Sequence, residues 1–116
     1  MIVAIQGTKT FNDYPVFLRA MGTALSEMKD DDKEFYIYSA GPAQINSMAL
    51  EFSNVSERSL KARGIRIKMI KIPPSWIKQN VHTLGYFAFF SKPKEPVSPL
   101  VSYAESKDAH VGVYRF

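Results

Sequence analysis

Short apolar segments alternate along this chain with segments of helical periodicity, and this alternation is the feature that most constrains its fold. The first apolar segment, residues 2–6, is continuous up to Gln6, which is typical of a strand buried on both faces. In residues 65–72, by contrast, apolar residues alternate with basic ones, which predicts a strand with one wet face at the edge of a sheet. Further strands are expected at residues 34–39, 86–90 and 109–116.

The intervening segments place their apolar residues three or four positions apart, as helices packed on one side do. We expect a helix over residues 14–28 capped by Asp13. A second follows the Ala40-Gly41-Pro42 turn and continues to Ala62-Arg63, irregular near Ser53 and Asn54 and ended by Gly64. A short helix or loop follows Pro73-Pro74, and Ser98 caps a last helix. This order predicts one α/β domain over residues 1–116, a three-layer Rossmann-like fold. Its mostly parallel sheet has about five strands, with helices on both faces.

The composition limits the chemistry that the chain can perform. With no cysteine, it forms no disulfide, thiolate metal site or cysteine nucleophile, and its two histidines lack partners at metal-ligand spacing. A formal net charge of +4 favours anionic ligands or partners. No apolar run reaches the length of a bilayer and no secretory signal opens the sequence, so we expect a cytoplasmic protein without membrane partners.

Two predicted strands end in glycine-containing turns that precede helices. Gly7-Thr8-Lys9 follows the first strand, and Ser39-Ala40-Gly41 ends the second. Such turns leave backbone N–H groups and a helix dipole directed at one place, which suits a phosphate.

A third loop, which begins with Ser91, follows the fourth strand. In a doubly wound sheet the binding crevice lies where the strand order reverses, here at the carboxyl ends of the first and fourth strands. Hydroxyl groups, amides and lysines would meet there and bind a nucleotide or another ligand that carries phosphate. The plainer alternative is that the glycines only make tight turns and the lysines are solvated. The predicted ligand-binding residues are Gly7, Thr8, Lys9, Ser39, Ala40, Gly41, Ser91, Lys92 and Lys94.

The stretch Gly7-Thr8-Lys9-Thr10-Phe11-Asn12-Asp13-Tyr14 resembles the opening of small proteins of the SLOG superfamily, a Rossmann-like group that includes relatives of lysine decarboxylases. Ser39-Ala40-Gly41-Pro42-Ala43-Gln44-Ile45-Asn46 lies where those proteins carry a Gly-Gly-Ala-x-Gly-Ala-Asp signature. Here Ala40, Gln44 and Asn46 replace two glycines and the aspartate. An alanine is accommodated at position 40 only if its φ is negative. Compact members of this kind are similar to proteins encoded by bacteria and their tailed phages, which implies the host cytoplasm if this chain is phage-encoded.

The eroded signature implies a sensor or sequestering module that binds a nucleotide-derived ligand without catalysis, and we assign no catalytic residue, metal or cofactor. A protein-interaction module with a vestigial pocket is the main alternative, in which residues 65–72 contact a host or structural protein or a second copy of the chain. A nucleotide N-glycosidase or phosphoribohydrolase is a third possibility. Nucleic-acid binding is less favoured, because most aromatic residues fall in core positions and Trp76 alone is expected to be exposed.

Overall fold

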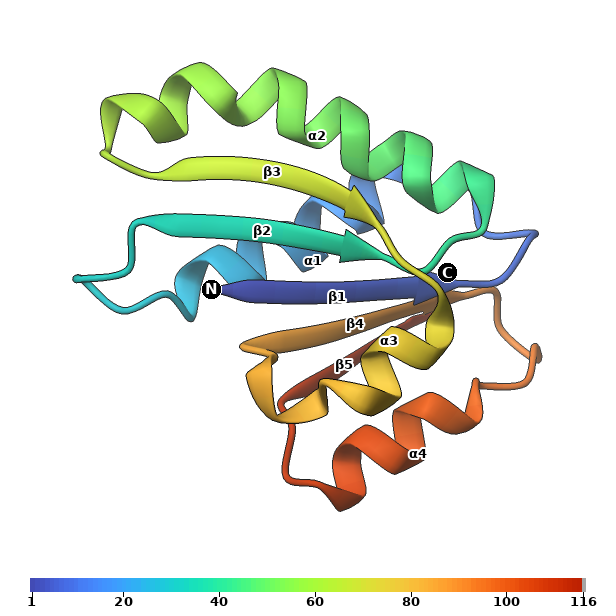
Figure 1. The fold of residues 1–116 in the computed structure, drawn as a ribbon. Coiled ribbons are helices and arrows are strands. Elements are labelled where there is room, and N and C mark those ends of the chain that lie inside the picture. The colour runs from blue at the N-terminus through green and yellow to red at the C-terminus, as the bar shows by residue number, and fades with distance from the viewer. Residues whose placement is uncertain (116) are drawn as a thin grey trace.

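The computed structural model describes residues 1–115 and contains one all-parallel sheet of five strands in the order β3-β2-β1-β4-β5 (Figure 1). The predicted α/β, Rossmann-like fold class is confirmed, including its alternation of strands and helices. The last strand was expected to reach Phe116, which lies outside the described residues. The strands are β1 (Ile2–Gly7), β2 (Glu34–Ser39), β3 (Arg66–Lys71), β4 (Tyr86–Ser91) and β5 (Val111–Arg115). The helices are α1 (Tyr14–Ser26), α2 (Ala43–Ala62), α3 (Pro74–Gln79), the single 3₁₀ turn η1 (Val81–Thr83) and α4 (Pro99–Ser106).

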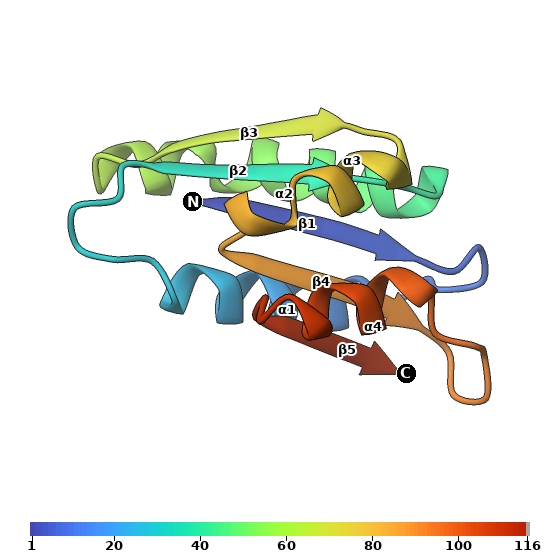
Figure 2. The same ribbon diagram turned by 60° about the horizontal axis from the view of Figure 1, so that its bottom comes forward.

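The helices cover the sheet from both sides and give three layers. α1 and α2 pack on one face, and α3 and α4 pack on the other, as Figure 2 shows. Strands β1 and β4 are buried between the helical layers, which explains why their residues are apolar on both faces. No helix among the described residues is both long and apolar enough to cross a bilayer.

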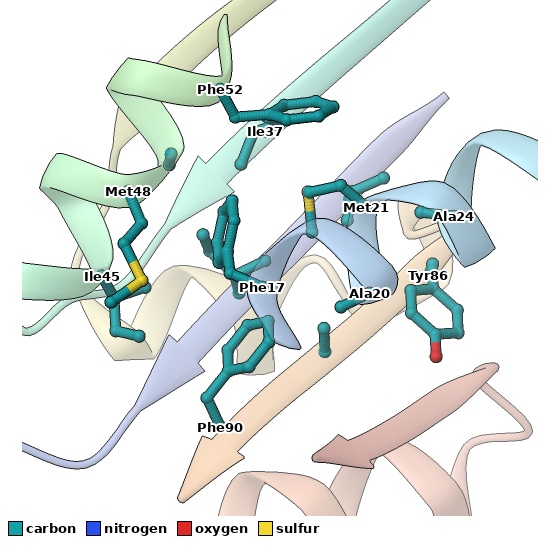
Figure 3. Close-up of a cluster of buried hydrophobic side chains, with 14 of the residues drawn as sticks. Phe17, Ala20, Met21, Ala24, Ile37, Ile45, Met48, Phe52, Tyr86 and Phe90 are labelled. Atoms are coloured by element: carbon teal, nitrogen blue, oxygen red, sulfur yellow. The ribbon is translucent and has the colours of Figure 1, made fainter. Parts of the chain in front are cut away.

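Aromatic rings fill the larger core, between the sheet and the helices α1 and α2 (Figure 3). Phe17 of α1 is fully buried, with its ring centroid 5.3 Å from that of Phe90 and 6.3 Å from that of Phe52. Ile45 at the start of α2 is fully buried beside them. This core fixes the helices α1 and α2 against the ends of β1 and β4, where the binding crevice was predicted.

The start of α1 and the end of α2 lie where the sequence predicts, whereas α1 ends at Ser26, two residues earlier than expected. The Asp13 carboxylate accepts a hydrogen bond from the Val16 N–H at 3.2 Å, and Gly64 ends α2 with a φ of +77°. The irregularity expected near Ser53 is absent, because α2 is continuous there and Ser53 is itself buried on its core side. Trp76 is only half-buried, because its ring packs 4.6 Å from that of Tyr38.

Candidate functional site at the carboxyl edge of the sheet

The chain reverses its strand order between β1 and β4, as the sequence predicts. β1 leads to α1 on one face of the sheet, whereas β4 leads to α4 on the other. The two loops therefore leave the carboxyl ends of neighbouring strands in opposite directions, the arrangement in which open α/β sheets bind ligands.

Hydrogen bonds join the three predicted loops to one another. The Gly7 N–H donates to the Gly41 carbonyl at 3.0 Å, and the Thr8 N–H donates to the Phe90 carbonyl at 2.9 Å. The loops that follow β1 and β2 and the end of β4 are thus neighbours, as expected. The expectation that the amides of Gly7 and Thr8 are free for a ligand is wrong, because both are satisfied within the protein.

The Glu95 carboxylate lies where the loop tips meet. One of its oxygens accepts hydrogen bonds from Thr8 Oγ1 at 2.9 Å and from the Lys92 N–H at 2.8 Å, and the other accepts one from Thr10 Oγ1 at 2.6 Å. The Thr10 hydroxyl and the Lys92 amide are the main reasons that the pKa of Glu95 is lowered. Thr8 Oγ1 and the loop amide of Lys92, donors expected to bind a ligand's phosphate, thus bind the protein's own Glu95 carboxylate in this structure. The sequence analysis missed this role of Glu95, although it is the one acidic residue in the loop of residues 92–98.

The turn after β2 is closed by its own hydrogen bonds. Gly41 is buried with a φ of +83°, a conformation that favours glycine, whereas Ala40 has no positive φ and its methyl group is tolerated. The Gly41 N–H donates to Ser39 Oγ at 3.3 Å, and the Ser39 hydroxyl donates to Asn46 Oδ1. The donors of this turn are therefore already occupied within the protein.

The three predicted lysines stand at the outside of these loops. Lys9, Lys92 and Lys94 are exposed, and within residues 1–115 none of their ammonium groups forms a salt bridge. Their positive charge is thus available to an anion approaching the loop tips from solvent.

A hollow of about 460 Å³ lies between α3 and α4, beside the end of β1. It is lined by Gln6, Pro74, Lys78, Ser98, Pro99, Leu100 and Tyr103. Lys78 Nζ lies 5.3 Å from the centroid of the Tyr103 ring, so the lining of the hollow contains a cation close to an aromatic ring. Ser98 Oγ accepts from the Leu100 N–H at 3.2 Å and caps α4 itself.

Two buried polar atoms have no hydrogen-bond partner in the described residues: Gln6 Oε1, whose residue lines this hollow, and Ser91 Oγ, whose residue is not part of the lining. Gln6 is opposite Phe89 in the ladder between β1 and β4, and Ser91 is two residues beyond Phe89 on the same face. Ser91 is fully buried. A buried polar group without a partner costs about 1–3 kcal/mol, so two such groups on the same face of the sheet are sites that a water or a ligand group would stabilise.

A second hollow, of about 320 Å³, lies between the first turns of α1 and α2. Its lining includes Asn12, Gln44 and Glu51 but no lysine or arginine. Because the Glu51 carboxylate has no cation beside it in this lining, the second hollow disfavours an anionic ligand. The hollow between α3 and α4 is therefore the better candidate for an anionic ligand. Within residues 1–115, no three histidine, aspartate or glutamate side chains are grouped as metal ligands.

Comparisons with models of protein families, with curated proteins and with solved structures find no match to this chain. The Rossmann-like topology is therefore the level at which the structure classifies it, and the likeness to the SLOG superfamily rests on the sequence motifs alone.

Proposed function

We propose that this protein binds a nucleotide or a nucleotide-derived ligand at the carboxyl edge of its sheet, without catalysis. The pair of unpartnered buried atoms, Gln6 Oε1 and Ser91 Oγ, is the observation that carries the proposal. A sugar or base has hydroxyl and amino groups that can donate to Gln6 Oε1 and pair with the Ser91 hydroxyl. The hollow that Gln6 lines has a volume in the range of small-molecule sites.

The charges around the site favour an anionic group on the ligand. Lys78 borders the hollow, and Lys9, Lys92 and Lys94 surround the loop tips without salt bridges of their own in the described part of the chain. Glu95 opposes this attraction, because its carboxylate occupies the hydroxyl groups of Thr8 and Thr10. A phosphate that uses those hydroxyls must displace Glu95, which predicts that Glu95→Gln binds phosphate-bearing ligands more tightly than the unaltered protein.

The lining of the hollow supports binding rather than hydrolysis of a glycosidic bond. It contains an amide, an ammonium, a phenol and a serine hydroxyl, but no carboxylate that could act as a general acid or base. The N-glycosidase alternative therefore has no residue in this hollow to carry it.

A thermal-shift panel of nucleoside mono-, di- and triphosphates and dinucleotides tests the proposal. A ligand at 100 times its Kd stabilises the folded protein by about 2.7 kcal/mol, which such a panel detects. We expect at least one nucleotide to raise the melting temperature, and we expect this rise to be smaller in the variants Lys9→Ala, Lys78→Ala and Lys92→Ala. Lys68→Ala is the matched control, because it removes the same charge from β3 at the far edge of the sheet.

Ser91→Ala separates a ligand-binding role from a structural one. Because Ser91 Oγ has no partner within residues 1–115, its removal should leave the ligand-free protein as stable as before or more so, while weakening the hit. No shift with any member of the panel, or equal shifts in the lysine variants and in Lys68→Ala, would contradict the proposal. Release of free base from a nucleotide would instead establish an enzyme.

A further inference from the structure

Strand β3 forms one edge of the sheet, and its outer side is open. Within residues 1–115 it pairs only with β2. At its two ends the Arg66 N–H donates to the carbonyl of Lys33, just before β2, at 2.8 Å, and the Ile72 N–H donates to the Ser39 carbonyl at 2.9 Å. Because backbone groups alternate in direction along a strand, the N–H and C=O groups of the odd-numbered residues Ile67, Met69 and Lys71 point away from β2. These groups are a template for one more strand.

The two faces of this edge differ in chemistry. On one face Arg66 and Lys68 are exposed and Ile70 is 37% exposed, and most of β2 and β3 has no helix in front of it from that side (Figure 1). On the other face a hollow of about 170 Å³ lies between α2 and β3, bordered by the apolar residues Ala43, Leu50 and Met69 and by the polar residues Asn46, Ser47 and Lys71. Leu50 is 52% exposed. A strand added to β3 would thus meet Arg66 and Lys68 on one side, and on the other a recess whose walls are partly apolar and include Lys71.

Charge decides which occupant fits this edge. Arg66, Lys68 and Lys71 are the charged residues of β3, and only Arg66 has an acidic partner within residues 1–115, Glu34 at 2.7 Å. A second copy paired through the same strand would bring these cations close to their counterparts, which disfavours a dimer through β3. An acidic chain meets no such repulsion.

We propose that β3 binds an extended acidic peptide segment of a partner protein, which adds to the sheet as a sixth strand. Alternate side chains of the segment are carboxylates that face Arg66 and Lys68, and those between them are apolar and cover Leu50 in the recess beside α2. The backbone of Ile67, Met69 and Lys71 supplies the hydrogen bonds, as in β-strand addition generally. β3 is two strands away from β1, whose Gln6 lines the proposed ligand site, and the peptide proposal does not depend on that site.

Fluorescence anisotropy with designed peptides tests the proposal. The probe is a labelled, end-capped peptide of about eight residues in which valine and glutamate alternate, and its counterpart has lysine in place of glutamate. Oligothymidylate serves as the nucleic-acid probe. We expect the acidic peptide to bind more tightly than the basic peptide or oligothymidylate, and its affinity to fall as salt is added. Equal binding of the acidic and basic peptides, or tighter binding of oligothymidylate, would overturn the proposal.

Variants of β3 separate the charge from the backbone. The double variant Lys68→Glu, Lys71→Glu should bind the acidic peptide about tenfold or more weakly than the unaltered protein does, and it should prefer the basic peptide. Lys71→Ala removes an ammonium group, whereas Lys71→Pro also removes an outward N–H, so the proline variant should bind about fivefold more weakly than the alanine variant. Equal affinities of these two variants would refute strand addition.

Leu50→Glu keeps the test decisive if the proline variant does not fold. The side chain is on the solvent side of α2, so the substitution leaves the core intact, yet it places a carboxylate in the recess. The Leu50→Glu variant should bind the acidic peptide about fivefold or more weakly than the unaltered protein does. The same change at Val55, which is 72% exposed on α2 and does not border the recess, is the control and should leave binding unchanged.

Discussion

Replacement of Gly7 by alanine tests how the carboxyl end of β1 is packed. A Cβ at this position would lie 2.8 Å from Ile45 Cδ1, 2.9 Å from Ile45 Cγ1 and 3.1 Å from the Phe90 carbonyl oxygen. Ile45 is fully buried, and the Phe90 carbonyl accepts a hydrogen bond from the Thr8 N–H, so neither neighbour can move freely. Overpacking of this kind costs about 1–3 kcal/mol, and the two contacts below 3 Å lead us to expect about 2 kcal/mol.

Equilibrium unfolding in urea measures this cost, and a second substitution traces it to its cause. Ile45→Val removes Cδ1, the atom of closest approach, and by itself should cost about 1 kcal/mol. Because the two residues touch, the double variant should be more stable than the sum of the single effects by about 1 kcal/mol. Gly22→Ala is the matched control: a Cβ there meets no atom within 4 Å on an exposed part of α1, so it should stabilise the protein by about 0.5–1 kcal/mol.

The reasoning fails if Gly7→Ala is as stable as the unaltered protein, or if its cost adds fully to that of Ile45→Val. Either result would mean that α2 does not press on the end of β1 as described. The glycine would then have to be explained by something other than close packing of helix and strand.

Three further substitutions or titrations test other parts of the structure. Asp13→Ala should cost about 1 kcal/mol in urea unfolding, because it removes the side-chain cap of α1. The hydroxyl of Thr10 and the amide of Lys92 lower the pKa of Glu95. The ionised Glu95 side chain therefore stabilises the fold at pH values above its ordinary pKa of 4.5, and this stabilisation is lost as the pH falls below 4.5. In a series of urea unfolding midpoints measured against pH, Glu95→Gln should lack this loss of stability at acid pH. Burial, and secondly the Tyr114 hydroxyl, raise the pKa of Tyr86, so folding stability should fall as the pH rises above the ordinary value of 10.0. Tyr86→Phe should make this alkaline loss smaller, and the raised pKa values of Tyr14 and Tyr36 leave the remainder.

The fold could be predicted because its signals are local and mutually consistent. Residues 2–6 are apolar on both faces because β1 is the central strand, and the alternation in residues 65–72 follows from the position of β3 at the edge. Asp13 and Gly64 mark helix ends through hydrogen bonding and a positive φ that depend on few neighbours.

The details of the site could not be predicted, because they depend on contacts between residues far apart in the sequence. Glu95 meets Thr8 and Thr10 across more than 80 positions, so nothing local indicates that a carboxylate occupies their hydroxyl groups. Gln6 is the next-to-last residue of β1 and Ser91 the last of β4, and the polarity of Gln6 in an otherwise apolar strand was the one available signal that the crevice also reaches the side of α3 and α4.

An NMR titration of isotope-labelled protein with the nucleotide panel tests the central claim most directly. The proposal predicts that the side-chain amide of Gln6 and the backbone amides of Ser91, Lys78 and Leu100 shift together and saturably, with smaller changes along β3. Shifts that avoid these four residues, or no saturable shift with any nucleotide, would contradict a ligand site between α3 and α4.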